Sequence, residues 1–301
     1  MKYGTAISLE PLENDAAYRD LIARECDVVV AENASKFGPL SPNEGLRDFS
    51  GFDRIASFAE AHGKLLRGHT LVWHNQAPAW LDESKHDLQS VLAEHIRETV
   101  GRYRGQIVSW DVVNEAIADD ATMRDTQWLR ALGPEYLDWA FREAHAADAD
   151  CELVYNDYNV ETVNPKSDAM VAMVQGFLDR GVPIHAVGLQ AHLEFANFPD
   201  LDSVRANIRR FRALGLNVHI TELDIRIPEP FTDEKREEQG RQYEAFARVC
   251  AEEGVDHFLT WGITDRYSWV PGFFTGTGEA LPFDKDLQPK PAIDGIQRAI
   301  A

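Results

Sequence analysis

Two glutamates at the ends of apolar, strand-like runs are the side chains best suited to chemistry in this sequence. Glu115 ends one run, and Glu222 stands near the end of another, followed by Asp224. Residues two apart on a strand point to one face, so Glu222 and Asp224 should emerge together. A protonated carboxyl opposite an ionised one is the equipment for glycoside hydrolysis. The amide of Asn114, beside Glu115, can both donate to and accept from a sugar hydroxyl.

Eight such runs alternate with helical patterns, and this alternation predicts the architecture that positions the glutamates. The predicted strands are Tyr3–Leu9, Val28–Asn33, Leu65–Trp73, Ser109–Glu115, Glu152–Tyr158, Ala186–His192, Asn217–Asp224 and His257–Ile263. Apolar residues at three- and four-residue spacing predict the helices Phe52–His62, Leu88–Tyr103, Glu135–Ala147, Asp168–Arg180, Leu201–Leu214, Thr232–Glu253 and Ala292–Ile300. Without a linker or a composition break, the pattern favours one α/β domain over residues 1–301, a closed (β/α)8 TIM barrel with no appended binding module.

Polar side chains fall at or just beyond the carboxyl ends of the predicted strands. In a barrel these ends converge on one mouth, which is where (β/α)8 enzymes carry their active sites. The set comprises Glu32, Asn33, His69, His74, Asn114, Glu115, Asp157, Tyr158, Gln190, His192, Glu222, Asp224, Trp261 and Asp265. Because stability does not call for so many polar groups at one end of a barrel, we expect a single functional cluster there.

The composition restricts the kinds of molecule that the protein is expected to bind. With 30 Lys and Arg against 50 Asp and Glu, the formal net charge is −20, which argues against nucleic acid or membrane binding and favours a neutral substrate. No apolar run reaches the roughly 18 residues of a membrane span. Cys26, Cys151 and Cys250 are widely spaced, which favours buried thiols over disulfides or a zinc site. We expect a monomer, either cytoplasmic or secreted with its signal peptide outside this sequence.

Five segments at the predicted strand ends strongly resemble glycoside hydrolase family 10, the retaining endo-β-1,4-xylanases. They are Gly68–His74, Asp111–Ala116, Gly188–His192, Thr221–Ile225 and Trp261–Trp269. One short match such as Asn-Glu would be a weak signal, whereas five in the right order across the whole chain are specific. The resemblance implies a TIM barrel that cleaves internal β-1,4-xylosidic bonds of xylan or xylo-oligosaccharides by double displacement, with no metal or other cofactor.

The resemblance also implies catalytic roles, position by position. Glu115 is similar to the acid/base, and Glu222 to the nucleophile that forms a covalent glycosyl-enzyme. His192 is similar to the family's histidine that hydrogen-bonds the nucleophile, and Asp224 would orient its imidazole. For retention the two carboxyls must lie roughly 5–5.5 Å apart.

Further residues are implied to hold the sugars. Gln190 and Asn114 would help to fix the nucleophile and the 2-hydroxyl of the sugar. The remaining set is Glu32, Asn33 and Lys36 for the second sugar on the non-reducing side, His69, Trp73 and Gln76 for the sugar being cleaved, Trp261 and Trp269 as aromatic walls, and Tyr158 on the leaving-group side. A wall close to sugar C5 would admit xylose and clash with the hydroxymethyl group of glucose. The family often has a cis peptide where this chain has His69-Thr70.

Two other functions stay open from the residues alone. A metal-dependent barrel hydrolase is suggested by the strand-end residues His69, His74, His192, His219 and Asp265. Against it, His219 should lie on the opposite strand face from Glu222, so these side chains should not converge on one metal ion. A non-catalytic carbohydrate-binding barrel would keep the cleft without turnover, although both glutamates are present.

The chain departs from the family pattern beside the implied substrate residues. Phe37 stands where tryptophan is usual, and Ala34, Ser35 and Ala77 are smaller than the residues common there. These departures leave open the preference for long or short chains and the tolerance of arabinose or glucuronic acid branches. They do not affect the two glutamates.

Overall fold

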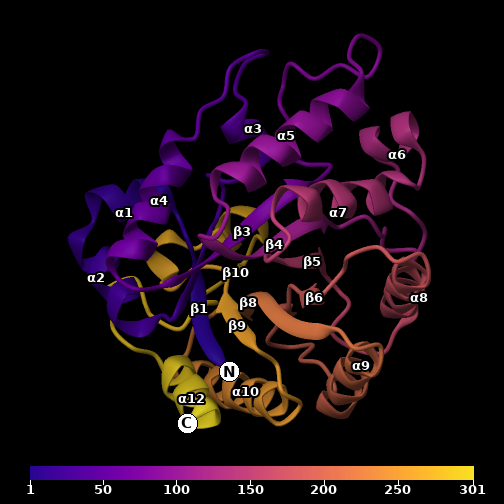
Figure 1. The fold of residues 1–301 in the computed structure, drawn as a ribbon. Coiled ribbons are helices and arrows are strands. Elements are labelled where there is room, and N and C mark those ends of the chain that lie inside the picture. The colour runs from indigo at the N-terminus through magenta and orange to yellow at the C-terminus, as the bar shows by residue number, and fades with distance from the viewer.

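The chain forms a closed (β/α)8 barrel in the computed structural model, which describes residues 1–301 (Figure 1). Adjacent barrel strands pair in parallel, and β9 pairs with both β1 and β8, so the barrel has no free edge. Its strands are β1 (Lys2–Ile7), β2 (Val28–Ala31), β3 (Leu65–Val72), β4 (Ile107–Asn114), β5 (Glu152–Asp157), β6 (Ala186–Leu189), β8 (Asn217–Pro228) and β9 (His257–Thr260). The prediction of a TIM barrel is confirmed.

Helices supply the crossovers that parallel strands require, and they surround the barrel in Figure 1. They are α1 (Leu9–Asn14), α2 (Ala16–Glu25), α3 (Phe37–Leu40), α4 (Ser50–Ala61), α5 (Leu88–Arg102), α6 (Gln127–Leu132), α7 (Tyr136–Ala147), α8 (Pro165–Asp179), α9 (Leu201–Ala213), α10 (Asp233–Glu252), α11 (Val270–Phe273) and α12 (Pro291–Ile300), with a 3-10 turn η1 (Asp265–Tyr267). Two short strands, β7 (His192–Glu194) and β10 (Thr277–Gly278), pair with the end of β8. The seven predicted helices are all present.

The first crossover differs from the prediction. The predicted strand Tyr3–Leu9 runs too far, because Leu9 already begins α1. The sequence pattern also missed α2, whose apolar stripe is narrow: only three of its ten residues are buried, namely Tyr18, Leu21 and Ile22. A mostly polar helix with so few core contacts gives a weak periodic signal.

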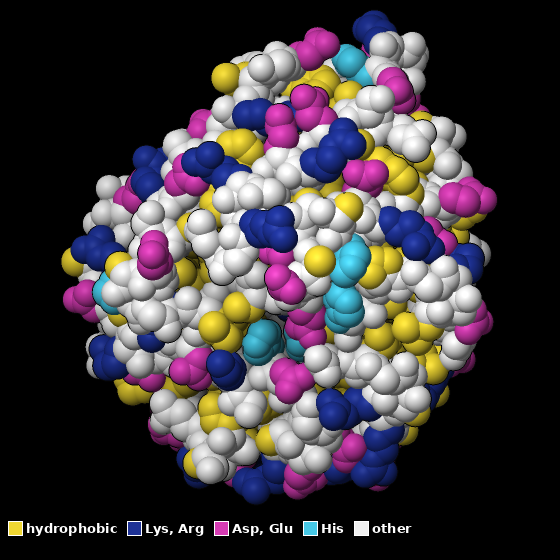
Figure 2. Space-filling model, in the orientation of Figure 1, with side chains coloured by type: hydrophobic (Ala, Val, Ile, Leu, Met, Phe, Trp, Pro, Cys, Tyr) yellow, Lys and Arg dark blue, Asp and Glu magenta, His cyan; other side chains and the backbone are white.

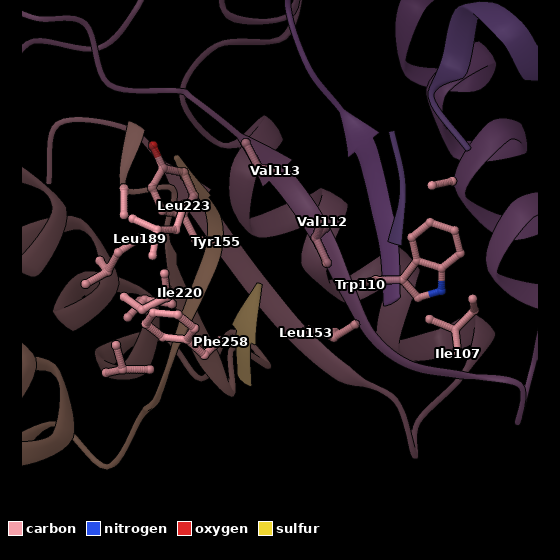
Figure 3. Close-up of a cluster of buried hydrophobic side chains, with 14 of the residues drawn as sticks. Ile107, Trp110, Val112, Val113, Leu153, Tyr155, Leu189, Ile220, Leu223 and Phe258 are labelled. Atoms are coloured by element: carbon pink, nitrogen blue, oxygen red, sulfur yellow. The ribbon is translucent and has the colours of Figure 1, made fainter. Parts of the chain in front are cut away.

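The main core lies between the outside of the barrel and the helices, where 69 buried residues form one apolar cluster. Figure 3 shows a part of it, with Leu189, Ile220, Leu223 and Phe258 gathered in one group. Such a core fixes the strands, and the strands in turn fix the side chains that point to the other face.

A bulge near the end of β8 sets the direction of Glu222. Between Ile220 and Leu223, β8 has one more residue than its partner β9. Ile220 and Leu223 therefore both face the apolar core, although they are three residues apart. Thr221 and Glu222, between them, both hydrogen-bond to Asn156 of β5 inside the barrel.

The same bulge corrects the prediction for His219. An ideal strand would place His219 and Glu222 on opposite faces, but both point into the barrel. His219 lies deeper: its Nδ1 is 2.8 Å from Nη1 of Arg67 on β3, across the barrel. Arg67 also pairs with Asp111 of β4, so a buried polar layer forms the floor below the mouth.

Acidic and basic side chains are interspersed over the face seen in Figure 2, without a continuous basic patch. Ion pairs such as Arg102 with Asp53, 2.6 Å apart, are frequent on the surface. None of the helices combines the length and apolar character needed to cross a membrane. The three cysteines are free and buried, as predicted.

Candidate active site

A cavity of about 600 Å³ opens where the barrel strands end, and it collects most of the predicted site residues. Those on its walls are Glu32, Asn33, Lys36, His69, Trp73, Asn114, Glu115, Tyr158, Gln190, His192, Glu222, Trp261 and Trp269. They come from segments far apart in the sequence, and the strand ends bring them together.

Two predicted residues do not line the cavity. Asp224 is fully buried behind the wall, where its Oδ2 lies 2.8 Å from Nδ1 of His192 and accepts a 3.0 Å hydrogen bond from Nε1 of Trp269. Gln76 is exposed and donates to Oδ1 of Asn33 at 3.2 Å. Both therefore reach the cavity only through a neighbour.

Glu222 sits among donors that favour its ionised form. Only 5% of its surface is exposed. Its Oε1 accepts a 2.7 Å hydrogen bond from Nδ2 of Asn156, and its Oε2 lies 3.2 Å from Nε2 of His192. Burial raises the pKa of Glu222, but the bond from His192, the nearby His69 ring and the bond from Asn156 together bring it below the ordinary value.

His192 lies between two carboxylates. Nε2 faces Glu222 and Nδ1 faces Asp224, so both ring nitrogens must donate. Only the imidazolium form has a hydrogen on each ring nitrogen. Burial lowers the pKa of His192, but the two carboxylates outweigh it and raise this pKa to about 10. The ring is thus a fixed positive charge beside Glu222 at neutral pH.

The side-chain hydrogen bonds to Glu115 all come from neutral donors. Its Oε2 accepts from Nε1 of Trp73 at 2.9 Å, and its Oε1 accepts from Nε2 of Gln190 at 3.0 Å and Nδ2 of Asn114 at 3.2 Å. No salt bridge involves Glu115. It follows β4 in a left-handed backbone conformation, with φ of 57°.

The amide side chains connect the two glutamates. Oδ1 of Asn114 accepts from Nε2 of Gln190 at 3.2 Å and from Nδ2 of Asn156 at 2.9 Å, and Asn156 in turn binds Glu222. The resemblance implies that Gln190 and Asn114 act on the nucleophile and the sugar. In the structure both side chains donate to Oε1 of Glu115, while Asn156 lies beside Glu222.

Asn156 is the functional candidate that the sequence reading missed. Its signal was its place among the polar residues that end β5, directly before Asp157. A second signal is Gly188 on the adjacent strand, where an added Cβ would lie 2.2 Å from Oδ1 of Asn156. A side chain at position 188 would displace the amide that holds Glu222.

The wall beside β2 contains a buried cation. Lys36 is 6% exposed, its Nζ lies 3.0 Å from Oδ1 of Asn33, and it stands 4.8 Å above the Trp73 ring. Burial lowers the pKa of Lys36, against the raising effect of Glu222 and Glu32. Such a site offers a charged donor and aromatic faces to a neutral polar ligand.

The departure at Phe37 lies outside this wall. Phe37 is buried in the core and stacks on His95, with ring centres 3.7 Å apart. The replacement of tryptophan at this position therefore changes core packing and not the cavity surface. The peptide between His69 and Thr70 is cis, as the resemblance implies.

The cavity has further lining residues that the sequence reading did not select. They are Asn75, Arg124, Asn159, Arg226, Phe273 and Phe274, and His74 of the predicted strand-end set also lines the cavity. Phe273 is 71% exposed, the largest exposure among the big apolar side chains. The Phe273-Phe274 pair follows Trp269 closely in the chain.

The residues that suggested a metal site do not assemble into one. No group of three or more His, Cys, Asp or Glu side chains in residues 1–301 has a geometry that could hold a metal ion. Nδ1 of His69 lies 2.9 Å from Asp111, Nδ1 of His192 lies 2.8 Å from Asp224, and His219 faces Arg67. The cavity instead combines two glutamates in unlike surroundings with aromatic walls and amides, which is the equipment that glycoside hydrolysis requires.

The comparisons identify the family. The profile of Glycosyl hydrolase family 10 matches residues 1–299. The chain is 37% identical over 285 residues to endo-1,4-beta-xylanase B of Thermotoga neapolitana, covering 93% of this chain and 82% of that protein. It is 39% identical over 300 residues to an endo-1,4-beta-xylanase of Agaricus bisporus, covering 98% and 89%. The solved structure of xylanase 10B from Thermotoga petrophila RKU-1 with xylobiose has a TM-score of 0.96 and 36% identity, covering 100% of this chain and 94% of that one. The protein belongs to glycoside hydrolase family 10.

Proposed function

We propose that this protein is a retaining endo-β-1,4-xylanase with Glu222 as nucleophile and Glu115 as acid/base. It cleaves internal bonds of xylan or xylo-oligosaccharides. One observation carries the assignment: two glutamates share one cavity, and an imidazolium holds Glu222 while neutral donors hold Glu115. A nucleophile must be ionised, whereas an acid/base must change its protonation state during each turnover.

The first chemical step forms a bond to Glu222. Its carboxylate attacks the anomeric carbon, and the bond from that carbon to the glycosidic oxygen breaks. Glu115 gives its proton to this oxygen, so the leaving chain departs as a neutral alcohol. The imidazolium of His192 stabilises the carboxylate before attack and orients it, while buried Asp224 holds the ring.

The second step releases the sugar from Glu222. Glu115, now a carboxylate, takes a proton from water, and the resulting oxygen attacks the same anomeric carbon. Two inversions give net retention of configuration.

The remaining lining residues suit a xylose chain. Glu32, Asn33 and Lys36 offer hydrogen bonds to the second sugar on the non-reducing side, with Gln76 supporting Asn33. His69 and Trp73, with the aromatic walls Trp261 and Trp269, surround the sugar being cleaved, and Tyr158 meets the leaving group. Ring faces and alternating donors and acceptors are what a sugar without charged groups requires.

Xylan hydrolysis by wild type and by Glu222→Ala tests the assignment. We expect reducing-sugar release by wild type, undiminished by EDTA, and a loss on the order of 10⁵-fold in the variant. Glu60→Ala, at an exposed position of α4, is the control and should match wild type. Equal release by wild type and Glu222→Ala would refute the nucleophile. Binding of xylan by wild type without any release would favour the non-catalytic barrel.

Two measurements sharpen the mechanism. The first product seen by NMR should be the β-anomer, and an initial α-anomer would contradict retention. Azide enters the space that Glu222→Ala leaves, so it should restore cleavage of an activated aryl xylobioside and yield the α-xylobiosyl azide. A β-azide product would place the nucleophile elsewhere.

A further inference from the structure

A buried lysine stands beneath the leaving-group side of the cavity. Lys166 lies in the first turn of α8, with 4% of its surface exposed. Lysine is almost never buried without a partner, and a cation at a helix N-terminus opposes the helix dipole. Its Nζ lies 2.9 Å from Oδ1 of Asp157 and 3.4 Å from the centre of the Tyr158 ring. An unfavourable location of this kind calls for a compensating role.

Asp157 connects this lysine to the chain that follows Glu115. Its Oδ2 accepts from the Tyr155 hydroxyl at 2.6 Å and from the Ile117 amide at 3.4 Å. The Tyr155 hydroxyl accepts from the Ala116 amide at 3.0 Å. The two amides that directly follow Glu115 are therefore both held by the Tyr155–Asp157 pair.

The backbone of Glu115 needs such support. Its φ of 57° lies in the left-handed region, which residues other than glycine rarely occupy. Its amide donates to the Asn156 carbonyl at 2.9 Å, and its carbonyl accepts from Nε of Arg124 at 2.8 Å. Arg124 also donates to the Tyr158 hydroxyl at 2.9 Å. With the two following amides, these bonds fix the direction in which the Glu115 side chain leaves the strand end.

We propose that Lys166 is a positioning residue for Glu115: its charge keeps Asp157 an acceptor for Tyr155 and Ile117, which hold Glu115 in its proton-donating orientation. The inference rests on the proposed role of Glu115 and extends it to α8. Burial raises the pKa of Asp157 to about 6 even though Lys166 and Tyr155 lower it. Without the lysine the pKa of this carboxyl would rise further, and a protonated carboxyl is a weaker acceptor than a carboxylate.

A second buried pair offers a matched control. Lys290, directly before α12, is 5% exposed, and its Nζ lies 2.9 Å from Oδ2 of Asp265. It also donates to the Glu279 carbonyl at 2.6 Å. This pair equals the first in burial and length but has no bond to the chain around Glu115. Its loss should cost stability without changing the acid step.

The test compares Lys166→Met with Lys290→Met on two substrates. Xylan has a poor leaving group that needs the proton, whereas an aryl xylobioside with a dinitrophenolate leaving group needs little. For Lys166→Met, corrected for the folded fraction, kcat/KM on xylan should fall about tenfold or more, and on the aryl substrate less than about threefold. For Lys290→Met the ratio of the two activities should stay that of wild type. An equal loss on both substrates for Lys166→Met would overturn the proposal.

The double variant D157N/K166M addresses the route through Asp157. Asp157→Asn already has a neutral acceptor at position 157, so adding Lys166→Met to it should lower the ratio of xylan to aryl activity little further. A further fall as large as the one that Lys166→Met causes in the wild-type background would overturn this route. Glu115→Ala, assayed beside them, separates the two levels of argument. If Glu115→Ala loses activity in the glycosylation step equally on both substrates, the acid/base assignment itself is wrong.

Discussion

The surroundings of the two glutamates differ in charge and in burial. Glu222 lies 5% exposed against an imidazolium that a second carboxylate, Asp224, holds from behind. Glu115 is half-buried and receives hydrogen bonds only from an indole and two amides, Trp73, Asn114 and Gln190. One carboxyl is hydrogen-bonded by a cation, and the other is hydrogen-bonded only by neutral donors.

This difference explains how two glutamates at the mouth of one barrel can have different roles. A neighbouring cation lowers the cost of the ionised form and so commits Glu222 to it. Neutral donors also favour the ionised form of a carboxyl, but less strongly than a cation does. The chemistry therefore depends less on the glutamates themselves than on which strand ends face each one.

Glu115→Ala should give the largest effect that distinguishes the two. On xylan the loss should be on the order of 10²–10⁴-fold, because the leaving chain departs unprotonated. On a dinitrophenyl xylobioside the burst of dinitrophenolate from the first step should be nearly unchanged, since this leaving group is stable as an anion. Pre-steady-state release of dinitrophenolate measures this step. Glu222→Ala, in contrast, should abolish the burst.

His192→Gln should remove the charge beside Glu222. The pKa of Glu222 lies below its ordinary value partly because of His192, so it should rise in the variant. The acid limb of kcat/KM on the aryl substrate should then move to higher pH, with activity lower by on the order of 10²-fold. His62→Gln, at the exposed end of α4, is the control and should keep the wild-type profile. If the acid limb does not move, His192 does not lower the pKa of Glu222.

The same histidine should affect stability on the alkaline side. Its folded pKa is raised to about 10, above the roughly 6.5 of a free imidazole. The ion pairs with Asp224 and Glu222 therefore contribute fully below about pH 6.5 and are lost as the pH rises through about 10. Thermal unfolding of wild type against His192→Gln, measured from pH 6 to 10, should show a difference that shrinks as the pH rises.

Sequence alone predicted the barrel because alternating strands and helices repeat with a clear period. It also predicted Glu115, Glu222 and most of the walls, because polar residues at strand ends are conspicuous in an apolar background. It could not predict the bulge in β8, since an extra residue in one strand leaves no periodic mark, and so it misplaced His219. The partners of individual amides, such as Gln190, depend on side-chain directions that spacing does not specify.

Substitution of Gln190 and of Asn156 tests whether the hydrogen bonds to Glu115 and to Glu222 act independently. A hydrogen bond to a charged group contributes about 1.5–3 kcal/mol, and about 1.4 kcal/mol corresponds to a tenfold change in rate. Asn156→Ala should therefore lower kcat/KM roughly tenfold or more on xylan and on the aryl substrate alike. Gln190→Ala should lower xylan turnover more than aryl turnover, because its partner is Glu115. The same pattern for both variants would mean that Asn114 couples the two sites into one.

The smallest effect is expected at the rim, far from either carboxyl. Phe273 lines the cavity with 71% of its surface exposed, and its ring centre lies 5.2 Å from that of Trp269. An aromatic face at the edge of a groove can stack on a sugar unit beyond the reaction centre, which would contribute about 0.5–1.5 kcal/mol. Phe273→Ala should raise KM for xylan by about two- to tenfold and leave the aryl xylobioside unchanged. Leu46→Ala removes another exposed apolar side chain, 48% exposed and outside the cavity, and should change neither substrate. A KM change on the short substrate would place Phe273 against the sugars that flank the scissile bond, inside the region that the two glutamates share.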